Sequence, residues 1–200
     1  MSLDIGVPIM AGMGTSETIR IVCFLVGSLG IAYVSRGSLA RPRSHGFFRF
    51  LAWELILALF LLNVEAWFVD PFAPHQVIAW FLLVACLLPL ALGVRTLRAL
   101  GRPTARRESE PELIAFEKTT TLVTTGIYRY IRHPLYSSLL LLAWGIFFKS
   151  PSWAGVALAS AATASLFATA LADEAECTHF FGPDYREYMR RTKRFVPFVI

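Results

Sequence analysis

Long blocks of apolar residues are the feature that most constrains this chain, because they determine the solvent in which it folds. Five such blocks occur, roughly at 19–35, 47–68, 76–95, 135–149 and 152–171. A helix needs about 20 residues to cross about 30 Å of hydrocarbon. Soluble domains are about a quarter charged, whereas this chain is 16% charged and 56% hydrophobic. The pattern predicts an all-α, polytopic integral membrane protein with about five transmembrane helices.

Proline positions refine this expectation. The fourth block is short because Pro134 and Pro151 bound it, which predicts a tight helical hairpin between the fourth and fifth spans. Pro89 should kink the third span, because proline lacks the N–H that continues a helix. We expect one membrane-embedded domain over 1–200, with three spans in 1–95 and the functional core in 96–200.

Basic residues are distributed unequally between the two sides of the predicted membrane. With the N-terminus outside, 17 of the 19 Lys and Arg residues fall on the inner side, which predicts a cytoplasmic C-terminus. The net charge of +5 then reflects topology and attraction to lipid headgroups, and we expect no nucleic-acid partner. The three cysteines form no Cys-x-x-Cys or Cys/His spacing, so we expect no metal.

Two acidic residues, Glu54 and Glu65, lie within the second block. They are about three turns apart and so nearly on one face. An acid in a span needs a partner or a wet cavity. Two interpretations remain: a polar lining for a substrate cavity, or structural bonds to a neighbouring helix and placement of Glu65 at the interface. We favour the structural interpretation.

The run GIYRYIRHPLY at 126–136 is the candidate site. Pro134 suits the first turn of a helix, with His133 at the cap. The free N–H groups of that helix would then point at a turn that carries Arg129, Arg132 and His133. Such a turn suits an anion such as a carboxylate or phosphate. The alternative is a basic turn that only anchors a membrane helix at the headgroups.

Acidic residues follow the fifth block, at Asp173 and Glu174. If the helix continues beyond the membrane, the hairpin brings these carboxylates to face the basic turn. The segment FGPDYREYMRR at 181–191 predicts a short amphipathic helix, with Tyr185 and Tyr188 on one face. The apolar segment 195–200 suits either a lid over the site or an interfacial anchor.

Two motifs in this order resemble the isoprenylcysteine carboxyl methyltransferase family and its relatives among membrane phospholipid methyltransferases. The first is LVTTGIY at 122–128 followed by RHPLY at 132–136, and the second is the acidic pair at 173–174 followed by FGPDYREY at 181–188. The similarity covers about 120–200.

The resemblance implies a methyltransferase that uses S-adenosylmethionine at the cytoplasmic face and methylates a lipophilic acceptor. It implies catalytic roles for Arg132 and Glu174. It assigns cofactor binding to Thr120, Thr121, Leu122, Val123, Tyr128, His133, Pro134, Leu135, Tyr136 and Asp173. The cationic turn would suit the donor's carboxylate, and carboxylates and aromatic faces would suit its ammonium and sulfonium, which are cations.

One departure bears on the acceptor. Four residues before the acidic pair the family places an arginine that contacts the substrate carboxylate, and this chain has Thr169 there. The acceptor is therefore left open between a lipophilic carboxylate, a thiol and a lipid amine. The alternative function is an NADPH-dependent membrane reductase like the sterol reductases, whose C-terminal half is similar to this family's.

Overall fold

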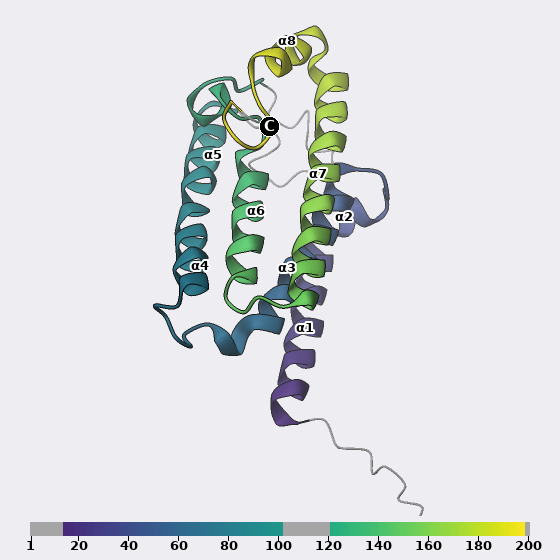
Figure 1. Cartoon of the computed structure of the whole chain (residues 1–200). Coiled ribbons are helices and arrows are strands. Elements are labelled where there is room, and N and C mark those ends of the chain that lie inside the picture. The colour runs from purple at the N-terminus through teal and green to yellow at the C-terminus, as the bar shows by residue number, and fades with distance from the viewer. Residues whose placement is uncertain (1–13, 102–120, 199–200) are drawn as a thin grey trace, which may run out of the picture.

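The computed structural model describes residues 14–101 and 121–198, which form helices and no strand. The all-α class is confirmed for these residues (Figure 1). In chain order the helices are α1 (Thr15–Val34), α2 (Arg36–Leu39), α3 (His45–Asn63), η1 (Val64–Ala66), α4 (Pro74–Ala85), α5 (Leu87–Leu100), η3 (Gly126–Arg129), α6 (Pro134–Phe147), α7 (Trp153–Phe181) and α8 (Pro183–Arg191).

Four helical segments are long and apolar enough to cross a membrane. They are Thr15–Val34, His45–Ala66, Pro74–Leu100 and Trp153–Phe181. Helix α6 has 14 residues and falls short of this length, so the fourth predicted span is a short apolar helix in the structure. The four segments indicate an integral membrane protein, whereas the count of five spans and their orientation stay predictions.

A break at Cys86 divides the third predicted span into α4 and α5. Pro89 lies three residues beyond the break and cannot donate the bond that would continue the helix from Ala85. The predicted interruption is thus confirmed, and it lies just N-terminal to the proline, where the missing bond and the ring act.

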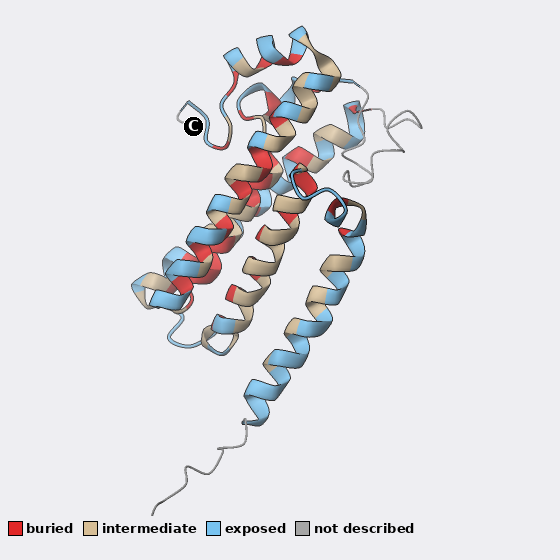
Figure 2. Ribbon diagram, turned by 90° about the vertical axis from the view of Figure 1, so that its right-hand side faces the viewer, coloured by how far each residue is buried: buried red, intermediate tan, exposed pale blue. Residues whose placement is uncertain are grey.

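The hairpin of α6 and α7 forms the centre of the bundle, with α3 packed along α7 (Figure 1). Small residues allow this close approach, because Ala159 and Ala162 on α7 are completely buried. They join Ile56 and Leu59 of α3 and Phe147 of α6 in one apolar cluster. Figure 2 shows the buried residues following one stripe of α7, while α1 is mostly exposed.

Lys149 lies at the turn of the hairpin and is buried. Its ammonium donates to Gln76 Oε1 at 2.9 Å and to the carbonyl of Trp67 at 3.3 Å. It also lies 3.4 Å from the centre of the Trp80 ring, a cation–π geometry. These contacts tie α4 to the hairpin at the end of the bundle away from the candidate site.

The acidic residues of the second span make structural contacts. Glu54 Oε2 accepts a hydrogen bond from Ser28 of α1, and Glu65 forms an ion pair with Arg20. The favoured interpretation is confirmed for both side chains, because each joins the second span to α1.

Candidate functional site

The predicted basic turn lies immediately before α6. His133 occupies the cap position and Pro134 the first helical position, as expected, although the His133 side chain does not cap the helix. Gly126 opens the turn with a φ of 62°, and a Cβ there would lie 2.9 Å from Thr96 Oγ1 of α5. A glycine therefore allows the turn to pack closely against α5.

The C-terminal tail fixes this turn through backbone hydrogen bonds. The N–H groups of Arg132 and His133 donate to the carbonyls of Lys193 and Arg194, at 2.8 and 3.1 Å. The side chain of Ser137 donates to the Phe195 carbonyl at 2.8 Å. Residues 193–195 thus fold back onto the turn, although none of them lines the pocket at this site. Phe195 is buried there, whereas Val196 and Phe198 are exposed.

Helix α8 supports the same turn from the other side. Its predicted amphipathic character is confirmed, because Tyr185 and Tyr188 are both buried on one face. The Tyr188 hydroxyl donates to the Tyr128 carbonyl at 2.7 Å. Burial raises the pKa of Tyr188, so its hydroxyl keeps the proton that it donates.

Glu174 is the central carboxylate of the site, and α7 continues through it as a helix. Arg132 approaches Glu174 Oε1 with Nε at 2.9 Å and Nη2 at 2.8 Å. Arg194 binds both oxygens, with Nε at 3.0 Å and Nη2 at 2.8 Å. The predicted proximity of the acidic pair and the basic turn is confirmed. Glu174 itself does not line the pocket described below.

His133 lies between the two carboxylates. Its Nδ1 is 3.4 Å from Asp173 Oδ2 and its Nε2 is 3.3 Å from Glu174 Oε1. Burial alone would lower the pKa of His133, but hydrogen bonds to Asp173 and Glu174 outweigh burial and raise the pKa. The ring stacks on Tyr136, whose hydroxyl donates to Asp173 Oδ2 at 3.3 Å.

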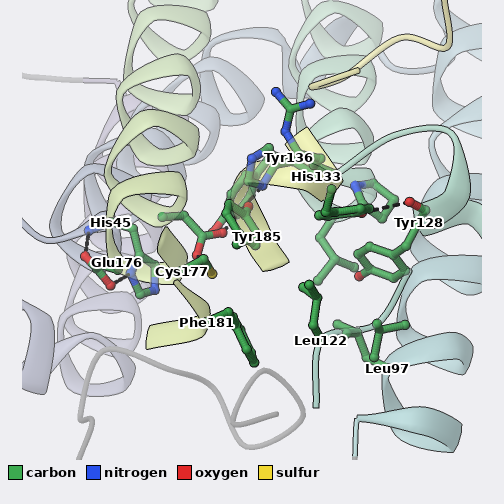
Figure 3. A pocket seen from close by; sticks show the side chains of 16 residues that line it. His45, Leu97, Leu122, Tyr128, His133, Tyr136, Glu176, Cys177, Phe181 and Tyr185 are labelled. Atoms are coloured by element: carbon green, nitrogen blue, oxygen red, sulfur yellow. Dashed lines mark hydrogen bonds and ion pairs between the residues drawn. The ribbon is translucent and has the colours of Figure 1, made fainter. Parts of the chain in front are cut away.

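A pocket lies where α5, the basic turn, α7 and α8 meet (Figure 3). Its walls combine aromatic rings, two carboxylates and the first turn of α6. Its lining includes Arg132, Leu135, Tyr136, Asp173, Glu176 and His45.

Eight of the predicted cofactor residues line this pocket. They are Leu122, Val123, Tyr128, His133, Pro134, Leu135, Tyr136 and Asp173. Thr121 is exposed and lines an adjoining hollow that shares Leu122 and Val123 with the pocket, while Thr120 lies outside the described residues.

Of the cationic residues expected to hold an anion, Arg132 and His133 lie at the pocket and Arg129 is exposed on η3. The Arg132 guanidinium already makes several hydrogen bonds within the protein. Besides Glu174, its Nη1 contacts the carbonyls of Met189 and Thr192. The guanidinium therefore holds the site together, and the peptide N–H groups of Leu135 and Tyr136 at the start of α6 are the better anion donors.

Sequence reasoning missed a second histidine–carboxylate pair, His45 and Glu176, on the wall of the same pocket (Figure 3). His45 begins α3, 131 residues before its partner. Ser44 caps this helix by accepting a hydrogen bond from the Phe47 N–H at 3.2 Å. A serine before an apolar run is a helix-start signal, and it would have moved His45 from the basic loop onto the helix.

Thr169 is completely buried on α7, and its hydroxyl donates to the Ser165 carbonyl within the same helix at 2.8 Å. It offers no positive charge at the position where the resembling family carries an arginine. Among the described residues no group of three or more His, Cys, Asp or Glu side chains is arranged to hold a metal ion.

Comparison with known proteins finds a family match in the core segment. Residues 111–181 match the phospholipid methyltransferase family. The resemblance indicated by the two motifs is therefore confirmed for this segment, which is similar to the methyltransferases of that family.

The cobalt-zinc-cadmium resistance protein CzcN of Cupriavidus metallidurans is 36% identical to this chain over 84 residues. That match covers 42% of this chain and 39% of the length of CzcN. No solved structure matches the chain.

Proposed function

We propose that this protein transfers a methyl group from S-adenosylmethionine to a lipophilic acceptor at the cytoplasmic face of a membrane. The observation that carries the proposal is the pocket in which Asp173 faces the first turn of α6, within the segment that matches the methyltransferase family. The distribution of basic residues favours the cytoplasmic face, because the basic turn and the basic tail surround this pocket.

The residues present fit the chemistry of the donor, which carries a carboxylate, an ammonium and a sulfonium. The N–H groups of Leu135 and Tyr136 suit the carboxylate, because the dipole of α6 adds to them. Asp173 suits the ammonium. The rings of Tyr128, Tyr136 and Tyr185 suit the adenine and the sulfonium, since aromatic faces attract cations. When bound, the cofactor would supply the methyl group.

Glu174 and Arg132 act in this proposal by positioning the other residues. Glu174 binds Arg132, Arg194 and His133, and so holds the turn and the tail together. His133 in turn orients Asp173 toward the pocket. Methyl transfer depends on alignment, and orientation alone supplies about 7–11 kcal/mol in well-ordered reactions.

Calorimetric titration of the detergent-purified protein tests the donor. We expect binding of S-adenosylmethionine and S-adenosylhomocysteine, no binding of NADPH, and at least about tenfold weaker binding in Asp173→Asn, since about 1.4 kcal/mol corresponds to tenfold. Asp184→Asn is the control, because Asp184 is an exposed carboxylate on α8 outside the pocket. Heat from NADPH with none from the sulfur compounds would instead support the reductase.

A further inference from the structure

His45 has one ring nitrogen committed to a carboxylate and the other without a partner among the described residues. Its Nδ1 lies 2.5 Å from Glu176 Oε2, and its backbone N–H donates to Glu176 Oε1 at 3.0 Å. Glu176 therefore binds both the backbone N–H and the ring of His45. The Nε2 atom is buried and has no hydrogen-bond partner in the described part of the chain.

An unpaired Nε2 destabilises the folded protein unless a ligand in the pocket binds it. The His45 side chain is 1% exposed, and a buried nitrogen without a partner forfeits about 1–3 kcal/mol. The residue lines the same pocket as Tyr136 and Asp173. A ligand in that pocket would supply the missing partner.

A carboxylate bound at Nδ1 fixes the ring in the tautomer whose Nε2 lone pair is free, and it stabilises the imidazolium that forms when Nε2 takes a proton. The charged groups that face His45 are Glu176 and Asp173 of α7 and Arg49 of α3. One carboxylate therefore contacts the ring and a second lies nearby, opposite a single guanidinium.

We propose that His45 is the general base of the reaction and that Glu176 positions it. The inference rests on the proposed methyl transfer and narrows its acceptor to a nucleophile that must lose a proton, an amine or a thiol. A carboxylate acceptor has no such proton.

The proposed step balances. The proton of the acceptor's N–H or S–H passes to His45 Nε2 while the acceptor's lone pair forms the bond to the methyl carbon. The bond from that carbon to the donor's sulfur breaks, and its electron pair stays on the sulfur, which becomes a neutral sulfide. The imidazolium then releases its proton to water.

The first test observes the nitrogen itself. The full chain in detergent micelles is labelled with ¹⁵N-histidine, and His45→Gln identifies the signal among the four histidines. We expect Nδ1 to stay protonated and Nε2 to lose its proton within pH 6–9, with Glu176→Gln shifting the proton toward Nε2. An Nε2 that keeps its proton across this range would overturn the proposal.

The second test compares acceptors of equal chain length: dodecylamine, dodecanethiol and dodecanoate. His45→Gln should slow methylation of the amine or thiol at least about 100-fold near neutral pH, within the usual range for a general base. The deficit should shrink as the pH rises toward the acceptor's own pKa. His179→Gln is the control, because His179 is exposed on the same helix as Glu176.

The outcomes separate this inference from the proposed function. Equal rates in His45→Gln and the unaltered protein, a deficit that is the same at every pH, or methylation of dodecanoate alone would each overturn the role of His45. S-adenosylhomocysteine should bind His45→Gln within about twofold of the unaltered protein. Failure of the unaltered protein to bind it would refute the proposed function, while the tautomer of His45 is measured independently. Should none of the three acceptors be methylated, the nitrogen measurement decides.

Discussion

Glu174→Gln should destabilise the protein strongly, and the site itself supplies a matched comparison. The Glu174 side chain is 9% exposed, and its partners Arg132 and Arg194 are 8% and 27% exposed. Removing one member of a buried ion pair costs about 3–5 kcal/mol because the remaining charge stays buried. Glutamine keeps one acceptor oxygen and Arg194 is partly solvated, so we expect about 2–4 kcal/mol.

Glu187→Gln is the control. Glu187 also binds two arginines, Arg190 at 3.4 Å and Arg191 at 2.7 Å, but on the exposed face of α8. The substitution and the number of arginine partners are the same; Glu174 also contacts His133, and it is buried whereas Glu187 is exposed. Exposed pairs contribute about 0–1 kcal/mol, so Glu187→Gln should change the free energy of unfolding very little.

Thermal unfolding in detergent, followed by intrinsic fluorescence, measures both variants. For a chain of this length, 1 kcal/mol shifts Tm by about 2–4 °C. We expect Tm to fall by about 4–16 °C in Glu174→Gln and by less than about 4 °C in Glu187→Gln. Equal shifts in the two variants would refute the reasoning, because they would show that burial of the Glu174 cluster contributes nothing.

Three further predictions follow from other contacts. The raised pKa of His133 means that its charged form stabilises the folded state fully below the unfolded pKa of about 6.5. This stabilisation is lost as the pH rises through the folded pKa. Tm measured from pH 6 to 9 should therefore fall, and His133→Gln should make Tm depend less on pH. Gly145→Ala should cost about 1–3 kcal/mol in chemical unfolding, since its Cβ would lie 3.0 Å from Leu83, whereas Gly30→Ala, with nothing within 4 Å, should not destabilise. Lys149→Met should cost about 1–3 kcal/mol by the same assay, because it leaves the buried oxygen of Gln76 without its donor.

The features predicted correctly are those that depend on a local sequence pattern, such as the position of a proline. Pro134 and Pro151 bound α6, and Pro89 interrupts the third span, because a proline limits a helix whatever surrounds it. The meeting of Glu174 with the basic turn also followed, since a hairpin brings its two open ends together. The family resemblance, rather than these patterns, supplied the expected cofactor residues, eight of which line the pocket.

The contacts that sequence reasoning missed join distant segments. Nothing near His45 in the sequence reveals a carboxylate 131 residues away. The role of Arg194 was hidden for the same reason, because its partner Glu174 lies on another helix. Lys149 reads as an exposed loop residue, and its burial depends on Gln76 and Trp80 of a different span.

The tail that folds back onto the basic turn sets the order in which the site is assembled during synthesis. The four candidate membrane spans found in residues 14–101 and 121–198 all precede this tail, yet Arg132 and His133 bond to residues 193 and 194. These spans are therefore synthesised before the pocket can close. A nascent chain halted after α7 would carry its helices but would lack the backbone carbonyls that hold the turn. The basic turn therefore cannot reach the conformation seen here until residues 193 and 194 have been synthesised.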